Sequence, residues 1–258
     1  MPTYETILYE KRDGVACIAL NRPERLNAVN RPMKVELRQA WQDVNTDRDV
    51  RVVILTGTGT RAFCAGADLK QAAAQGFEPG QKSWVTPIDC GVRKPIVCAV
   101  NGVCSGGAIG FVADSDLVIC AENAYFKDGR VSNGVVSVVG TTRLTRRIPL
   151  QAVLRLALLG KHGQITSQQA LALGLVGEVV PSEQLMETAW RLALAIAENS
   201  PAAVMATKAA IWDTLNSGLD AAVEQSWRAI AAYRGHPDIT EGPRAFAEHR
   251  KPQWQPPA

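Results

Sequence analysis

The alternation of apolar and polar side chains predicts a β-hairpin near the start of the chain. Side chains alternate over residues 4–10, Asp13 and Gly14 form a turn signal, and residues 15–20 are an apolar run. Two strand signals on either side of an Asp-Gly pair are typical of a tight turn between neighbouring strands.

A helix and further strands are predicted after the hairpin. The helix is expected to begin at Asn30, a favoured capping residue, and apolar side chains then recur at helical spacing as far as Val44. Apolar runs at residues 51–56, 95–100 and 116–121 predict strands. Strands that alternate with helices at this spacing indicate an α/β fold.

The pattern predicts helices throughout the chain after about residue 140. Thr166 and Gln169 form a capping-box signal, Ser200 precedes a proline, and residues 219–233 have helical character. We therefore expect a core domain over residues 1–198 and a helical region over residues 199–258.

Composition and charge exclude several classes of protein. The chain has 258 residues, 47% of them hydrophobic, and 28 Lys and Arg against 25 Asp and Glu give a net charge of +3. This is too apolar for a disordered chain and too balanced for a nucleic-acid-binding protein. No apolar run is long enough to span a membrane, and the first residues do not resemble a signal peptide. We expect a cytoplasmic protein with neither nucleic acid nor membrane as a partner.

The cysteines and histidines predict reduced thiols and no metal site. The six cysteines form no C-x-x-C pair, and the three histidines share no metal-ligand spacing with them.

Two glycine-bearing loops are the strongest candidates for chemistry. Residues 57–70 and 101–108 each follow a predicted strand and lead towards a predicted helix. Backbone N–H groups at such a junction favour negative charge, and two loops side by side could donate to one oxyanion. For either loop alone, glycines that only permit a tight turn are the simpler explanation. Ser105 lies where a hydrolase nucleophile would, but not within the pattern G-x-S-x-G.

Five segments resemble the crotonase (enoyl-CoA hydratase/isomerase) family and occur in that family's order. They are residues 21–28 (NRPERLNA), 62–70 (AFCAGADLK), 99–107 (AVNGVCSGG), 140–147 (GTTRLTRR) and 170–176 (ALALGLV). The resemblance implies a ClpP/crotonase-like α/β fold of repeated ββα units with a C-terminal helical trimerisation region. It also implies an acyl-CoA thioester as substrate, no cofactor other than the coenzyme A (CoA) of that substrate, and a homotrimer or a dimer of trimers.

The same resemblance implies roles for particular residues. The backbone N–H groups of Ala67 and Gly107 would form the oxyanion hole for the thioester oxygen. The substrate- and CoA-binding positions would be Ala28, Ala65, Ala67, Asp68, Leu69, Lys70 and Gly107. Residues 71–87 are expected to line the acyl pocket.

The chain departs from the family pattern at both glutamates that the hydratases use. Gly110 and Arg130 align with these positions, and neither is an acid. Because hydration needs a general acid and base, we expect it to be weak or absent. Asp128 and Arg130 are the candidate catalytic residues, Asp128 as a replacement acid and Arg130 as an anion donor. The alternative is that Asp128 pairs locally with Lys127 or Arg130 and that Arg130 is a surface residue.

The expected function is therefore an acyl-CoA-processing enzyme of the enoyl-CoA hydratase/isomerase type, which stabilises an enolate with a non-standard acid/base set. One alternative is a catalytically silent acyl-CoA-binding protein, and another is a carbon–carbon bond hydrolase or lyase of the same fold. If Asp128 pointed to solvent, the silent protein would be favoured.

Overall fold

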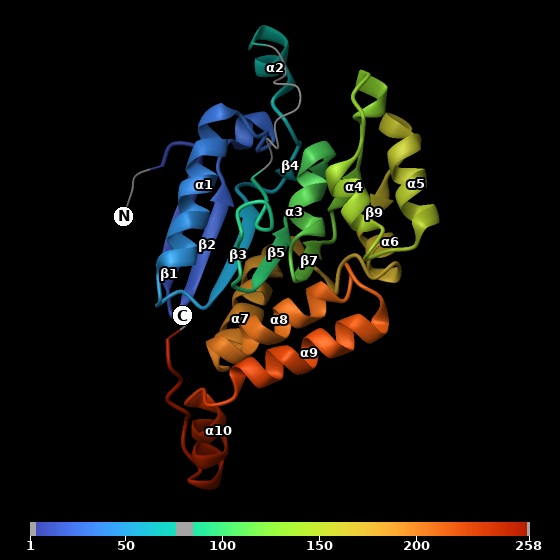
Figure 1. Cartoon of the computed structure of the whole chain (residues 1–258). Helices are drawn as coiled ribbons and strands as arrows, with labels where there is room; N and C mark the ends of the chain where they lie inside the picture. The colour runs from blue at the N-terminus through green and yellow to red at the C-terminus, as the bar shows by residue number, and fades with distance from the viewer. Residues whose placement is uncertain (1–3, 76–84, 257–258) are drawn as a thin grey trace.

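The computed structural model describes residues 4–75 and 85–256, and these residues form two β-sheets (Figure 1). The large sheet has the strand order β1 (Ile7–Arg12), β2 (Val15–Leu20), β3 (Val52–Gly57), β5 (Ile96–Val100), β7 (Leu117–Ala121) and β10 (Glu178–Val180). The small sheet has the order β4 (Ala62–Cys64), β6 (Val103–Ser105), β8 (Tyr125–Lys127) and β9 (Ile165–Thr166).

The α-helices surround these sheets and extend beyond them at the C-terminal end (Figure 1). In chain order they are α1 (Arg31–Thr46), α2 (Leu69–Gln75), α3 (Ile109–Ala113), α4 (Val139–Leu144), α5 (Leu150–Leu158), α6 (Ser167–Ala172), α7 (Leu185–Ala197), α8 (Pro201–Asp213), α9 (Leu219–Tyr233) and α10 (Asp238–Ala247). The predicted α/β fold is confirmed.

The predicted hairpin and first helix are confirmed. β1 and β2 pair antiparallel, and Asp13 and Gly14 between them have φ angles of 53° and 76°. The side chain of Asn30 accepts a hydrogen bond from the N–H of Met33 at the start of α1. This cap fixes where the helix begins, and its apolar stripe then lies buried against the sheet.

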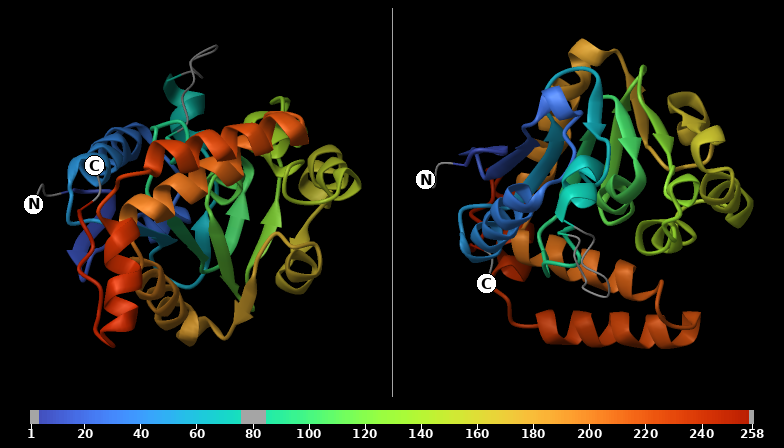
Figure 2. Two further views of the ribbon diagram at one scale, coloured as in Figure 1. Left: turned by 60° about the horizontal axis from the view of Figure 1, so that its bottom comes forward. Right: turned by 90° about the horizontal axis from the view of Figure 1, so that it is seen from above.

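Both faces of the large sheet are covered, which explains why its strands are so apolar. On one face α7 packs against alternate strand residues such as Val15 and Ile54. On the other face α1 and the small sheet cover residues such as Ile18 and Leu55 (Figures 1 and 2). The small sheet is thereby held against a rigid layer of packed strands.

The expectation of helices throughout the second half of the chain is wrong at two places. β10 pairs parallel with β7 in the large sheet, and β9 pairs antiparallel with β8 in the small one. These strands have three and two residues. Such short strands depend on the longer strand beside them, so local periodicity does not reveal them.

The C-terminal helices lie partly outside the α/β core. The hydroxyl of Ser200 caps α8, as expected, and Lys208 on α8 pairs with Asp116 at 2.8 Å. Helix α9 packs beside α8 and forms an outer layer in both views of Figure 2. The division into residues 1–198 and 199–258 stays a prediction. Within the described part of the chain, no helix is long and apolar enough to cross a membrane.

Candidate active site

The carboxyl ends of parallel strands in the small sheet bring three predicted site segments to one edge. β6 pairs parallel with both β4 and β8, and Ser105 is level with Lys127. The chain continues from β4 into residues 65–68, from β6 into residues 106–107, and from β8 into residues 128–130. In α/β proteins, ligands bind outside such strand ends.

The backbone around Ala67 leaves one N–H group without a partner. Val29 donates its N–H to the carbonyl of Gly66 at 2.8 Å, and Asp68 donates to the carbonyl of Val29 at 3.0 Å. Ala67 is the residue between these two bonds, so its own N–H points away from Val29. None of the hydrogen bonds within residues 4–75 and 85–256 uses this N–H, which is therefore available to a ligand.

Gly107 supplies a second N–H group close to the first segment. It is the middle residue of the short 3₁₀ helix Gly106–Ala108, so its N–H has no acceptor within that helix. Gly66 has a φ of 93°, and a Cβ built on it would lie 2.8 Å from the carbonyl oxygen of Ser105 and 3.3 Å from the nitrogen of Gly107. The two loops therefore touch, and only a glycine permits this approach. Two such donors can stabilise negative charge on one oxygen.

Asp128 does not point to solvent. Its side chain is fully buried, and Arg130 holds it through Nε at 2.9 and 3.2 Å, Nη2 at 2.6 Å and the backbone N–H at 3.1 Å. The hydroxyl of Ser137 donates to it as well. Burial opposes the charge, but these hydrogen bonds and the guanidinium charge outweigh it and hold the pKa of the Asp128 carboxyl below its usual value. The alternative that Asp128 pairs with Arg130 is thus confirmed.

Gly110 lies buried in α3, and Thr86 closes the space beside it. A Cβ built on Gly110 would lie 3.1 Å from Cγ2 of Thr86. A longer side chain at position 110 would need this methyl group to move. Thr86 belongs to the segment 71–87 that was expected to line the acyl pocket, of which residues 76–84 lie outside the described residues.

The residues expected to flank CoA converge on Arg22, which the sequence analysis did not single out by itself. Nη1 of Arg22 donates to the carbonyl of Ala28 at 2.6 Å and pairs with Asp68 at 3.0 Å. Ala65 donates its N–H to Leu26 at 2.9 Å, which ties the same two segments together. Burial opposes ionisation of Asp68, but bonds from Gln71 and Arg22 lower the pKa of its carboxyl. Leu69 and Lys70 are exposed at the start of α2.

Sequence reasoning also missed an ion-pair network behind Thr86. Arg143 on α4 donates to the buried carboxylate of Asp114, to Asp89 at 2.8 Å and to the hydroxyl of Thr86 at 3.3 Å. Oδ1 of Asp114 is buried without a hydrogen-bond partner in the described part of the chain. Burial raises the pKa of Asp114 to about 6, although Thr86 and Arg143 oppose the shift. The one indication of Arg143 in the sequence is that it lies in segment 140–147, which resembles the family.

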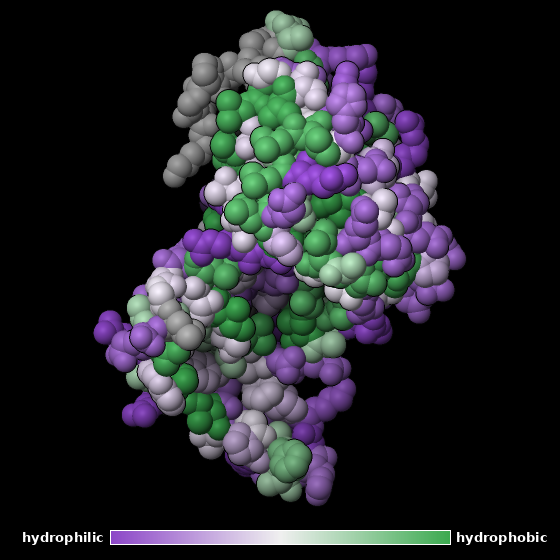
Figure 3. Space-filling model, turned by 90° about the vertical axis from the view of Figure 1, so that its right-hand side faces the viewer, coloured by the Kyte–Doolittle hydropathy of each residue, from purple (hydrophilic) through white to green (hydrophobic). Residues whose placement is uncertain are grey.

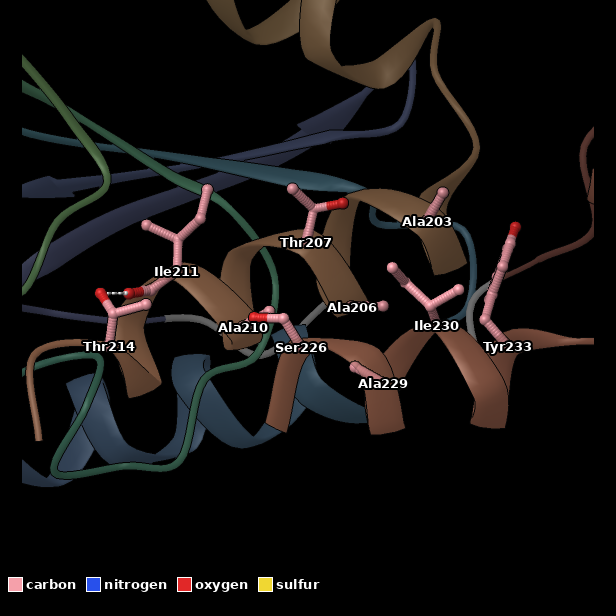
Figure 4. Close-up of a pocket in the computed structure, with 10 residues that line it drawn as sticks. All are labelled: Ala203, Ala206, Thr207, Ala210, Ile211, Thr214, Ser226, Ala229, Ile230 and Tyr233. Carbon is pink, nitrogen blue, oxygen red and sulfur yellow. Dashed lines mark hydrogen bonds between the residues drawn. The ribbon is translucent and has the colours of Figure 1, made fainter. Parts of the chain in front are cut away.

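A hollow lies away from this site, between α8 and α9 (Figure 4). Its volume is about 310 Å³, and small or apolar side chains from both helices line it, including Ala206, Ala210, Ile211 and Ile230. None of the candidate site residues named above is among the residues that line this hollow. Among the described residues, no group of three or more His, Cys, Asp or Glu is arranged to hold a metal ion.

Comparison with known proteins agrees with this geometry. A model of the enoyl-CoA hydratase/isomerase family matches residues 10–257, nearly the whole chain. The chain belongs to the enoyl-CoA hydratase/isomerase family. Among curated family members, it is 35% identical to the mevalonyl-coenzyme A hydratase of Aspergillus fumigatus, over 94% of this chain and 92% of that protein. It is 33% identical to the carnitinyl-CoA dehydratase of Proteus mirabilis, over 95% of this chain and 96% of that protein.

The solved structures of the family show the same fold. An enoyl-CoA hydratase/isomerase from Mycobacterium paratuberculosis superposes with a TM-score of 0.91 at 38% identity, and covers 98% of this chain and 99% of that one. The crotonase fold expected from the five segments is confirmed. The roles of Ala67, Gly107, Asp128 and Arg130, and the replacement of two glutamates, stay predictions.

Proposed function

We propose that this protein binds an acyl-CoA thioester and processes it through an enolate, whose oxygen accepts hydrogen bonds from the N–H groups of Ala67 and Gly107. The observation that carries the proposal is the contact between the two loops at Gly66, with an unused backbone N–H on either side. Donors fixed in advance are worth several kcal/mol where charge develops, typically about 3–4 kcal/mol for one donor. The CoA-binding role of Ala28, Ala65, Asp68, Leu69 and Lys70 belongs to the same proposal.

In this proposal Asp128 and Arg130 act together as an ion pair beside the oxyanion hole. An arginine does not release its proton in proteins. A carboxylate with a lowered pKa and four donors around it is a weak base. The pair carries no net charge, so its contribution is the N–H donors of Arg130 held in a fixed position rather than proton transfer. Asp128 does not point to solvent, so the observation that would have favoured a silent acyl-CoA-binding protein is not made.

Hydration is expected to be slow in this scheme, although the curated relatives include a hydratase and a dehydratase. Loss of a positioned acid or base costs about 10²–10⁴-fold in rate, and neither Gly110 nor Arg130 can take that role. We expect the wild-type protein to bind crotonyl-CoA but to turn it over far below the ordinary value of about 10 per second. Turnover at the ordinary rate would show that another group transfers the proton.

The oxyanion hole is tested by Ala67→Pro, which removes one N–H donor. Thioester binding and turnover should both fall, by about 10²-fold or more for turnover. Ala67→Gly keeps the donor and is the matched control. If a folded Ala67→Pro protein bound and processed its thioester like the control, the oxyanion assignment would be wrong.

We also propose that the chain assembles as a homotrimer or a dimer of trimers. The support is two separate apolar stripes that the fold leaves exposed.

A further inference from the structure

Arg130 uses only one of the two edges with which a guanidinium can grip a carboxylate. Nε and Nη2 form the side edge, and both donate to Asp128. Nη1 and the outer N–H of Nη2 form the end edge, and no hydrogen bond within residues 4–75 and 85–256 uses Nη1. The side chain is 17% exposed, so it is neither sealed in the core nor free in solvent. One fork is therefore occupied and the other is available.

The available edge is held firmly in place. The backbone N–H of Arg130 also donates to Asp128, and the hydroxyl of Ser137 fixes the far side of that carboxylate. Thr141 contacts the hydroxyl of Ser137 at 3.2 Å, which extends the support into α4. An arginine fixed in this way loses little side-chain freedom when it binds an anion.

Arg130 also lies beside the oxyanion hole rather than elsewhere on the edge of the sheet. A Cβ built on Gly106 would lie 3.9 Å from Cγ of Arg130, and Gly106 precedes Gly107 in the 3₁₀ turn. Asp128 and Gly106 leave the parallel strands β8 and β6 at the same level, because Lys127 is level with Ser105. A group bound by Arg130 would therefore lie close to the turn that carries Gly107, where the proposed function places the thioester.

The same chain already shows one arginine shared between two carboxylates. Arg143 donates through Nη1 to Asp114 and through Nη2 to Asp89, and its side chain is 30% exposed. Among the described residues, Arg130 pairs with one carboxylate, that of Asp128, whereas Arg143 pairs with two. Arg143 is more exposed than Arg130, at 30% against 17%, and it shows that one guanidinium of this chain can serve two carboxylates.

We propose that the end edge of Arg130 binds a carboxylate carried by the acyl group, so that the preferred substrates are CoA thioesters of dicarboxylic acids. This inference rests on the proposed function, because it assumes that the thioester lies at Ala67 and Gly107. In this proposal Arg130 determines which acyl groups are preferred, and Asp128 is the residue that positions Arg130.

The test compares thioesters of equal shape that differ only in the carboxylate. Malonyl-CoA is paired with isovaleryl-CoA, and succinyl-CoA with 4-methylvaleryl-CoA, since an isopropyl group has the shape of a carboxylate. Dissociation constants are measured by calorimetry, and mass spectrometry of the recovered ligand excludes turnover. We expect the wild type to prefer the charged member of at least one pair by about tenfold or more, the worth of a charge-assisted bidentate contact.

Two variants assign this preference to Arg130. Asp128→Asn with Arg130→Gln removes both charges together, so no unpaired buried carboxylate is left to unfold the protein. The ratio of the two dissociation constants should fall to near one in this double variant. Arg130→Lys keeps the charge without the fork and should give an intermediate ratio. Thermal unfolding of each variant checks that it is folded.

The outcomes separate this inference from the proposed function. No preference in the wild type for either pair overturns the carboxylate site, and so does a preference that persists in the double variant. If acyl-CoA thioesters bind without such a preference, the proposed function stands and only the choice of substrate is wrong. If none of the four thioesters binds but crotonyl-CoA does, only the carboxylate site fails; if crotonyl-CoA does not bind either, both proposals fail.

Discussion

Asp114 and Asp128 are both buried aspartates paired with an arginine, yet their pKa values move in opposite directions. Every oxygen of Asp128 has a donor, from Arg130 or from Ser137. Oδ1 of Asp114 has none among the described residues, so the cost of burying its charge is not fully offset. Burial raises the pKa at both sites. At Asp114 the nearby Asp89 carboxylate raises it further, whereas at Asp128 the hydrogen bonds from Arg130 and Ser137 outweigh burial and lower it.

Because the pKa of Asp114 is raised in the folded protein, we expect the free energy of unfolding to depend on pH. The pKa is about 6 in the folded protein against an ordinary 3.8, so the folded state binds the proton more tightly than the unfolded state. Its contribution to stability is full below about pH 4 and is lost as the pH rises through 6. A shift of this size corresponds to about 3 kcal/mol. Asp114→Asn cannot titrate and should lack this loss.

Urea unfolding of the wild type and of Asp114→Asn between pH 4.5 and 8 measures the effect. The free energy of unfolding of the variant, relative to the wild type, should increase by about 2 kcal/mol over this range, because the first part of the loss occurs below pH 4.5. Arg143 stays paired with Asp89 in the variant, which limits other damage. Parallel stability curves over this range would mean that the carboxyl is solvated or paired in a way that cancels its burial.

Single residues also show what the sequence reveals and what it hides. The closeness of the loops that carry Ala67 and Gly107 could be expected because both loops follow buried strands, whereas the choice of these two residues came from the family resemblance and stays a prediction. The Asp128–Arg130 pair was weighed as a local ion pair for the same kind of reason, two residues on one turn. Arg143 and Asp114 lie 29 residues apart, and Arg143 and Asp89 lie 54 apart. Such contacts depend on how α3 and α4 cross, which no local pattern contains.

At the scale of elements, the position of the site depends on how closely α4 approaches α3. A Cβ built on Gly140 would lie 2.7 Å from the backbone nitrogen of Gly110 and 3.1 Å from its Cα. Backbone atoms cannot move aside as a flexible side chain can. Glycine at position 140 therefore lets the helices approach closely, and α4 carries Thr141 and Arg143 to their partners.

Gly140→Ala should push the two helices apart and destabilise the fold. Overpacking of this kind costs about 1–3 kcal/mol, seen as a lower midpoint of urea unfolding. Gly177→Ala is the matched control, because the nearest atom to a Cβ built there is the carbonyl oxygen of Val118, at 3.8 Å. An equal loss of stability in both variants would mean that loss of the glycine itself, rather than helix crowding, is responsible.

The elements themselves were mostly predictable because most of them are long or capped. The stripe of α1, the capping box of α6 and the Ser200 cap of α8 are local signals, and the structure contains all three. β9 and β10 were not predictable, because two or three residues carry no period of their own. Their stability comes from the strands beside them, whose paired residues lie 39 to 59 positions earlier in the chain.

At the scale of the whole molecule, two helices carry apolar stripes on surfaces that the described part of the chain leaves open. On α5 the stripe is formed by Leu150, Leu154 and Leu158, which recur every four residues and are all exposed. On α9 it is formed by Val223, Trp227 and Ile230. Figure 3 shows apolar surface over the lobe that carries α4 and α5, and a hollow between this lobe and the C-terminal helices. Exposed stripes of this kind mark contact surfaces.

Large apolar residues of the C-terminal helices differ in whether the chain itself already covers them. Met205 is buried within the chain, and Trp212 donates its ring N–H to Asp116 at 2.6 Å. Both serve the contact between α8 and the core. Trp227 is 63% exposed and is the one of these three that remains available to a partner. Helical periodicity gives the apolar face of each helix, but only the packing of α8 on the core shows which faces are already used.

Two different exposed stripes, rather than one, are what a closed ring of three copies requires. A two-fold dimer joins identical surfaces, whereas a cyclic trimer joins one surface of each copy to a different surface of the next. We therefore expect the α5 stripe of one copy to meet the α9 stripe of its neighbour. Sedimentation velocity at micromolar concentration should show a trimer or a hexamer. Trp227→Glu and Leu154→Glu should each dissociate it, whereas Gln225→Glu, on the opposite face of α9, should not.

Mixing the two dissociated variants gives the sharper test of this ring. Trp227→Glu keeps an intact α5 stripe and Leu154→Glu keeps an intact α9 stripe. Since each variant has one functional surface, an equimolar mixture should form a one-to-one complex that cannot grow further. Complementation of this kind is impossible if each stripe meets its own copy in a two-fold contact. A stable wild-type monomer, or a mixture that stays monomeric while the wild type is a dimer, would rule out the head-to-tail ring.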